Sequence, residues 1–205
     1  MKKYFLEIVV FICGAVVMAY EIIGSRMLGP YVGTSMMVWS SIIGIILLSL
    51  SLGYYYGGKM ADQKPKYKSL AFIIAGSALL IILSTLLKDV VLSALLSIST
   101  NVKLVSILAS ILLFSLPAFG LGMVSPFAAR LKMKDVKTSG ATVGSLYALS
   151  TLGSITGTFL AGFYFIPSFR ITTILMILAL VLILSALGLY FFNSDKNKIP
   201  VQNNT

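Results

Sequence analysis

The chain has 205 residues, of which 58% are hydrophobic and only 11% are charged, and its mean hydropathy is +0.99. Soluble domains carry about 25% charged residues, so a globular protein of this composition would have too little polar surface to face water. The sequence therefore predicts an all-α integral membrane protein, divided into spans of about 20 residues each.

The formal net charge is +10, from 16 Lys and Arg against 6 Asp and Glu. A basic chain suggests a nucleic-acid partner, but here the charges fall in short connections between apolar segments. Retention of Lys and Arg on the cytoplasmic side of a membrane explains this pattern better. The expected partner is the lipid bilayer, including its anionic headgroups, and no nucleic acid.

Histidine is absent, and Cys13 is the single cysteine. An intrachain disulfide, imidazole-ligated metal sites and Ser-His-Asp catalysis are therefore excluded. Six scattered acids do not suggest a cage of oxygen ligands for a metal ion. We expect no catalytic residues, no metal and no cofactor.

Six apolar segments are long enough to cross a bilayer. The first follows Lys2 and Lys3, and a signal peptide is the alternative interpretation. Glu7 would interrupt the apolar part of such a signal, so we interpret the segment as a span. The expected spans are residues 4–24, 35–56, 69–87, 104–124, 140–166 and 171–192, followed by a disordered tail at 193–205.

The connections differ in character. Residues 57–68 and 125–139 are expected to be polar, basic loops, and residues 90–98 an interfacial helix or an extension of the third span. Pro117 with Gly120 and Gly122 suggests a kink in the fourth span. Three Gly-x-x-x-Gly pairs predict close helix packing, within the bundle or across an interface: Gly53 with Gly57, Gly140 with Gly144, and Gly153 with Gly157.

The distribution of basic residues sets the expected orientation. With the N-terminus in the cytoplasm, 12 of the 16 Lys and Arg lie inside and 4 lie outside, the latter being Arg26, Lys88, Lys103 and Arg170. Both termini are therefore expected in the cytoplasm of a plasma-membrane protein.

Glu21 is the most unusual residue, since an ionised carboxylate is costly to bury in a membrane. Three glycines and Pro30 follow within twelve residues, which predicts a sharp turn after the first span. Three interpretations stay open: an interfacial carboxylate that reaches water, an ion pair with Arg26, or a substrate or proton site. The ion pair requires the helix to end near Gly24, because residues five apart on a continuous helix point about 140° apart.

Aromatic residues flank this stretch. Trp39, Tyr20 and Tyr31 either belong to the aromatic belt at the outer interface or surround an organic cation beside Glu21. The substrate-binding candidates are thus Glu21, Arg26, Tyr31 and Trp39. Asp62 is expected to brace a helix end by pairing with a basic residue.

A set of motifs resembles one family. Six spans with two basic loops, and Gly58-Lys59-Met60-Ala61-Asp62 after the second span, are similar to half of a major facilitator transporter. The closer resemblance is to the membrane portion of fused facilitator-like/spermidine synthase proteins. It is carried by Glu21, Ser25-Arg26, Pro30, Gly33, Ser35, Trp39, Gly53, Gly57-Gly58, Asp62, Gly122, Ser125-Pro126, Arg130, Gly144, Tyr147, Thr151, Gly153-Ser154, Gly157 and Pro167.

The resemblance implies a six-helix bundle like half of a facilitator fold, with Asp62 and Arg130 as structural or gating residues. It also implies a soluble aminopropyltransferase domain, but the chain contains no nucleotide-binding unit, so no catalytic residue of that domain has a counterpart here. Two functions are expected: a small transporter for a polyamine or another organic cation, completed as a homodimer, or a membrane partner of a separately encoded aminopropyltransferase. An enzyme acting inside the membrane is the least favoured class.

Overall fold

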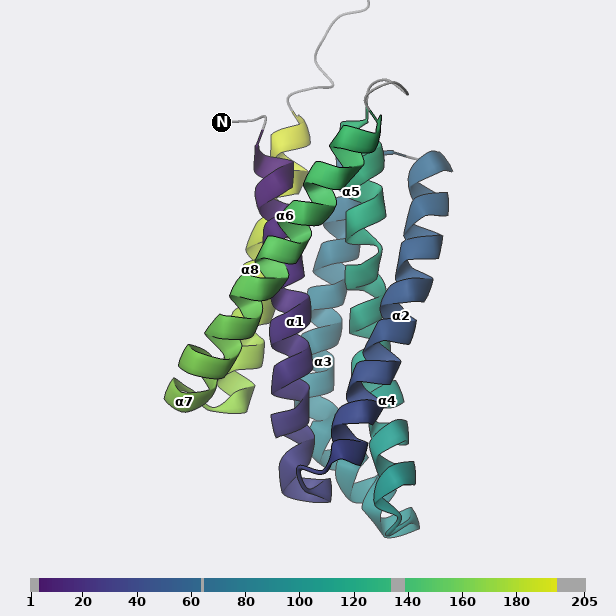
Figure 1. Cartoon of the computed structure of the whole chain (residues 1–205), viewed down its shortest axis with the longest axis vertical. Helices are drawn as coiled ribbons and strands as arrows, with labels where there is room; N and C mark the ends of the chain where they lie inside the picture. The colour runs from purple at the N-terminus through teal and green to yellow at the C-terminus, as the bar shows by residue number, and fades with distance from the viewer. Residues whose placement is uncertain (1–3, 64, 134–138, 195–205) are drawn as a thin grey trace, which may run out of the picture.

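The computed structural model describes residues 4–63, 65–133 and 139–194 (Figure 1). Within these ranges every regular element is a helix, and six helical segments are long and apolar enough to cross a membrane. The elements are α1 (Phe5–Val32), α2 (Met36–Gln63), α3 (Tyr67–Ile98), α4 (Val102–Gly122), α5 (Val124–Lys132), α6 (Ser139–Phe159), the π-helical η2 (Leu160–Phe165), α7 (Ile166–Ser168) and α8 (Ile171–Ser194). The chain is a multi-pass membrane protein with an all-helical bundle.

The first span is longer than expected, so the sharp turn predicted after it comes later in the chain. Helix α1 continues through Gly24, Gly29 and Pro30 to Val32, and the turn comes at Gly33, whose φ is 79°. Inside a bilayer an unpaired backbone amide is costly, so a helix is kept even through Gly and Pro where neighbouring helices can pack against it. A Cβ on Gly24 would lie 3.0 Å from the ring of Phe114. Gly24 is therefore a packing residue.

One connection confirms an expected alternative, and another differs from the expectation. Residues 90–98 extend α3, which was one of the two alternatives. Most of the second basic loop is helical, because α5 continues the direction of α4 after a break at Met123 and ends at Lys132. Lys134 and Lys137 lie outside the described residues, as does the predicted disordered tail beyond Ser194.

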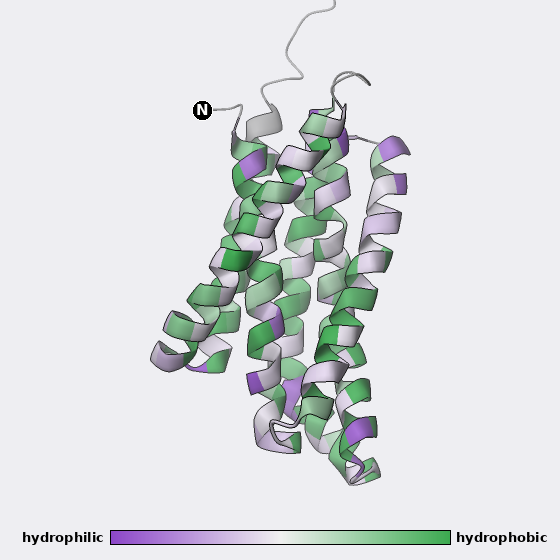
Figure 2. Cartoon of the chain, viewed as in Figure 1, coloured by the Kyte–Doolittle hydropathy of each residue, from purple (hydrophilic) through white to green (hydrophobic). Residues whose placement is uncertain are grey.

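The helices form a ring that is open on one side. Helix α2 packs mainly against α4, α4 against α3, α3 against α8, and α1 against α6. Helices α2 and α6 have little direct contact with each other, and they flank the face seen in Figure 1. Figure 2 shows that apolar residues dominate the middle of the bundle and that the most hydrophilic positions gather mainly toward its two ends.

Glycines bring α2 and α4 into backbone contact. A Cβ on Gly53 would lie 2.3 Å from the carbonyl oxygen of Phe119, far inside van der Waals distance. The close approaches in this pair of helices are Gly53 to Phe119, Gly57 to Met123 and Gly122 to Leu50. Close approach of this kind is typical of small residues at membrane helix interfaces.

The same contact recurs between α6 and α1. A Cβ on Gly157 would lie 2.0 Å from the carbonyl oxygen of Ala15. The close approaches here are Gly153 to Phe11, Gly157 to Ala15 and Gly14 to Ser150. The predicted packing role of these glycine pairs is confirmed within the bundle, whereas Gly140 and Gly144 have nothing within 4 Å of a Cβ.

The two sets of contacts match residue by residue. In these contacts each α2 residue has its counterpart 100 positions later in α6, as in Gly53 and Gly153. Each α1 residue has its counterpart 108 positions later, as in Gly14 and Gly122. Helix α1 begins at the end of the bundle where α5 ends, and α4 starts from the opposite end (Figure 1). The chain therefore contains two three-helix repeats of inverted topology, α1–α3 and α4–α8.

Candidate functional site

Glu21 lies deep within the first span. Its side chain and backbone together are only 8% exposed, and it forms no ion pair or hydrogen bond with any described residue. No fully buried side-chain oxygen in the described ranges lacks a partner, so the carboxylate oxygens of Glu21 keep some solvent-accessible surface. The carboxylate is 11 residues from the end of α1, about 16 Å along the axis. That depth is too great for the interfacial interpretation.

Arg26 is not the partner of this carboxylate. Because α1 is continuous, the two side chains point about 140° apart, and Arg26 is exposed. The pair is absent among the ion pairs of the described residues, which are Lys88 with Asp89, Arg130 with Asp62, and Lys132 with Glu7. The hypothesis of a structural ion pair between Glu21 and Arg26 is wrong.

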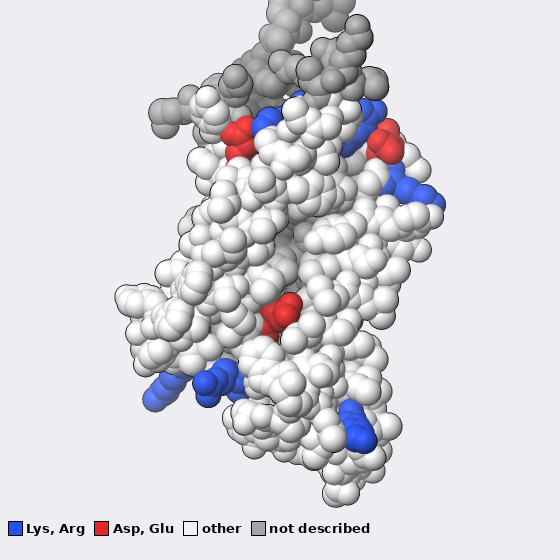
Figure 3. All heavy atoms as spheres, viewed as in Figure 1, with Lys and Arg blue, Asp and Glu red and all other residues white. Residues whose placement is uncertain are grey.

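Glu21 projects toward the side of α1 that faces α6. It follows Gly14 by seven residues, so the two lie on nearly the same helix face, and Gly14 packs against Ser150 of α6. Farther along, α6 diverges from α1 toward α7 (Figure 1). Figure 3 shows one acidic patch at middle height on this face, in a band that is otherwise uncharged.

Trp39 does not lie level with Glu21. Ile42 of α2 meets Gly24 of α1, so the antiparallel residue level with Glu21 is near position 45. Trp39 is then about 9 Å closer to the end of the bundle where α1 ends. It is partly exposed, which fits the aromatic-belt interpretation.

Tyr31 belongs to a separate cluster near the end of α1. Its hydroxyl donates a hydrogen bond to Asp89 of α3, which also pairs with Lys88. Tyr31 lies ten residues beyond Glu21, about 15 Å along the helix. The structure therefore does not gather the four substrate-binding candidates into one site, and Glu21 stands without the other three. The third aromatic, Tyr20, is buried and bonded to Ser84 and Leu113 inside the core.

The two gating candidates do meet. The Arg130 guanidinium lies 2.9 Å from the Asp62 carboxylate, which pairs the end of α2 with α5. Lys132 of the same short helix pairs with Glu7 of α1. Helix α5 is thus held from both sides at the basic end of the bundle. The Asp62 pair is exposed, so its contribution to stability is only about 0–1 kcal/mol.

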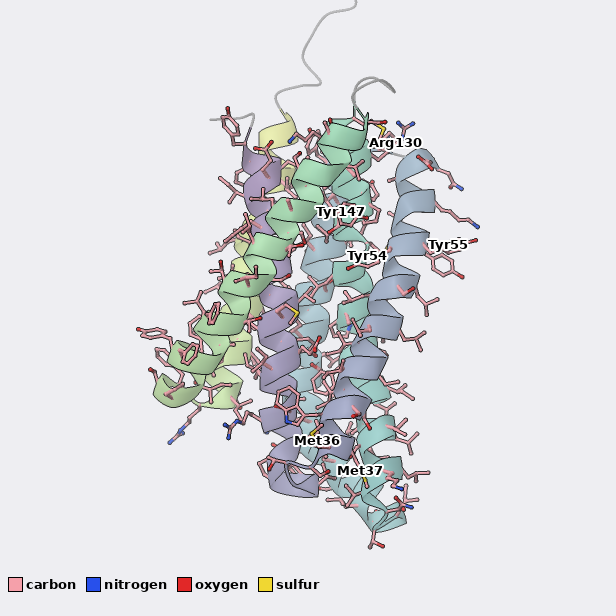
Figure 4. The ribbon with its side chains drawn as sticks, in the orientation of Figure 1. Met36, Met37, Tyr54, Tyr55, Arg130 and Tyr147 are labelled. Atoms are coloured by element: carbon pink, nitrogen blue, oxygen red, sulfur yellow. The ribbon has the colours of Figure 1, made fainter. Side chains whose placement is uncertain are left out.

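A pocket of about 250 Å³ opens beside this pair. Tyr147 of α6 and Tyr54 of α2 both lie between these helices, and Arg130 lies near the end of the same face (Figure 4). The lining residues are Gly58, Asp62, Pro126, Ala129, Arg130, Met133, Val143 and Tyr147. Sequence reasoning missed this pocket because its walls come from helices far apart in the chain. The one available signal was the Gly-x-x-x-Gly spacing that repeats 100 residues apart at Gly53 and Gly153.

Within the described ranges, no three Asp, Glu or Cys side chains gather closely enough to hold a metal ion. The carboxylate of Glu21 is unpaired and lies in an apolar setting, which favours binding of one positive charge. Comparisons with protein-family models, with curated proteins and with solved structures found no match.

Proposed function

We propose that this chain is a small facilitator-like membrane transporter, or a transporter subunit, that binds an organic cation at Glu21. The observation that carries the proposal is the state of that carboxylate, which is 8% exposed and unpaired among the described residues. Intramembrane acids are costly and typically mark pathways for ions or substrates. A bound cation would supply the missing counter-charge.

The inverted repeat supports transport over a purely structural bundle. Inverted repeats allow a transporter to open alternately to its two sides by moving one repeat against the other, around a site near the bilayer midplane. Glu21 lies near the middle of α1. The counterpart of α1 is α4, which continues into α5, and α5 carries the ion pairs to Asp62 and Glu7. The two ends of the open face therefore differ in charge although their backbones correspond.

The proposed substrate class is a polyamine or a related organic amine. Purified protein reconstituted into liposomes should take up radiolabelled 1,4-diaminobutane faster than liposomes without protein, and unlabelled polyamine should compete. Equal uptake with and without protein would contradict transport of this class.

We infer that a second copy completes the path. In the apolar 18-residue stretch of each span, only 33% is buried in the span of α2 and 17% in the span that begins with α6. In the other four spans the buried share is 44–56%. On the exposed face of α6 lie Gly140, Gly144, Tyr147 and Thr151, which suit contact with another helix better than contact with lipid chains. Native mass spectrometry of the reconstituted sample should show a homodimer, and a monomer with full uptake would contradict it.

The proposed orientation places both termini in the cytoplasm of the plasma membrane. Basic side chains lie at both ends of the bundle, but their larger share is at the end where α1 begins (Figure 3). In a Cys13→Ser background, a cysteine at Lys66 should react with a membrane-impermeant maleimide only after the cells are opened. A cysteine at Lys103 should react in intact cells. The reverse pattern would invert this topology.

A further inference from the structure

The inverted repeat relates the residues that line the pocket beside Arg130 to a second set of residues that includes Glu21. The offsets that relate the glycine contacts carry its lining residues to positions around Glu21. Ala129 corresponds to Glu21 itself. The other counterparts are Met18 for Pro126, Ile22 for Arg130, Ser25 for Met133, Ile43 for Val143, Leu47 for Tyr147 and Thr158 for Gly58.

The burial of the counterparts supports this correspondence. Glu21 and Ala129 are 8% and 6% exposed, respectively. Leu47 and Tyr147 are both exposed, and Thr158 and Gly58 are both partly buried. Met18 with Pro126 and Ile43 with Val143 also agree in burial, so five of the seven pairs match. Ser25 is buried where Met133 is partly buried, and Ile22 is partly buried where Arg130 is exposed.

The helical register is unbroken between the glycine contacts that define the two offsets and the counterpart residues named above. Across the break between α4 and α5, Met123 still bonds to Phe119 and Phe127 to Met123, so no residue is inserted there. On α6 the π-helical η2 begins at Leu160 and changes the register. The correspondence is therefore used only as far as Thr158, and the counterpart of Asp62 is left out.

Two hydroxyls among these counterpart positions, those of Ser25 and Thr158, can act only as hydrogen-bond acceptors toward a ligand. Ser25 donates its hydrogen to the carbonyl of Ile22, over 2.8 Å, and Thr158 donates its hydrogen to the carbonyl of Ser154, over 2.9 Å. A hydroxyl has one hydrogen and two lone pairs. With the hydrogen committed to the backbone, each oxygen can only accept a further hydrogen bond.

We infer that Glu21, Ser25 and Thr158 form a binding site for a primary ammonium group, with Met18, Ile43 and Leu47 as its apolar wall. The inference rests on the proposed cation binding at Glu21 and names the rest of that site. A primary ammonium has three N–H donors, which match one carboxylate and two acceptor hydroxyls. An alkyl chain attached to the nitrogen would lie along the apolar wall. A quaternary ammonium has the same charge but no N–H group, so it would leave both hydroxyls unused.

The test measures binding of radiolabelled 1,4-diaminobutane to the protein in lipid nanodiscs. Thr158→Val keeps the side-chain shape and removes the acceptor, and it should weaken binding at least about tenfold, as should Ser25→Ala, because each removes a hydrogen bond to a charged group. Thr158→Ser should retain binding. The matched control is Thr156→Val, on the same helix, because Thr156 makes the same backbone bond to Leu152 but is exposed. Thermal melting of each variant shows that it is folded.

The outcomes separate this inference from the proposed function. The bis-quaternary, fully methylated form of the same diamine should compete at least about tenfold less well than the diamine. Equal competition, or a Thr158→Val variant that binds like Thr156→Val, would overturn the three-residue site even if Glu21→Gln abolishes binding. If Glu21→Gln binds the diamine like the wild type, the proposed function falls as well.

Discussion

Substitution of Gly157 by alanine should lower the melting temperature of the protein markedly, because its Cβ would lie 2.0 Å from the carbonyl oxygen of Ala15. The oxygen is a backbone atom and the position of a Cβ is fixed by its own backbone, so no side-chain rotation can relieve the clash and α1 must move away from α6. Overpacking of a core typically costs about 1–3 kcal/mol, and occasionally more. The cost here is expected at the upper end of that range.

The chain offers matched controls for this prediction. Gly144 lies on the same helix with nothing within 4 Å of a Cβ, so Gly144→Ala should be neutral, or stabilising by up to about 1 kcal/mol through its higher helix propensity. The inverted repeat predicts the same contrast between Gly53→Ala and Gly44→Ala in α2. Melting curves in one detergent compare all four variants. Similar melting temperatures for Gly157→Ala and Gly144→Ala would contradict the close contact.

The number of spans was predictable because it depends on composition and length alone. A bilayer requires about 20 apolar residues for each crossing, and six segments satisfy this in both the sequence and the structure. The ends of the helices were less predictable. Gly24 and Pro30 suggested a turn because both weaken helices in water, but inside a membrane the cost of unpaired backbone groups keeps α1 intact to Val32.

The candidate site was predictable only in part. Glu21 stood out because a charge in an apolar segment needs a reason, and the pairing of Asp62 with a basic residue is confirmed by its contact with Arg130. Trp39 and Tyr31 were grouped with Glu21 by closeness in sequence, whereas helix geometry separates them along the axis. Thr158 lies on another helix, and only the inverted repeat relates it to Glu21.

Substitution of Glu21 by glutamine should abolish uptake of the diamine while the protein stays folded. Two opposite charges about 4 Å apart attract by about 4 kcal/mol at the effective dielectric constant typical of proteins, which corresponds to roughly a thousandfold in affinity. Glutamine keeps the size of the side chain and removes the charge. Glu21→Asp should retain part of the uptake, because it keeps the charge but withdraws it by one methylene.

Arg26→Gln is the control for a general change in charge. Arg26 is exposed and lies on another side of α1, so its loss should change uptake by no more than about threefold, since exposed charges are largely screened by salt. Uptake by proteoliposomes and thermal melting should be measured on the same preparations. If Glu21→Gln retains uptake and only lowers the melting temperature, Glu21 is a structural residue and the cation must bind elsewhere. If both Glu21→Gln and Arg26→Gln abolish uptake, the two charges act together despite their separation, and the isolated carboxylate does not explain binding.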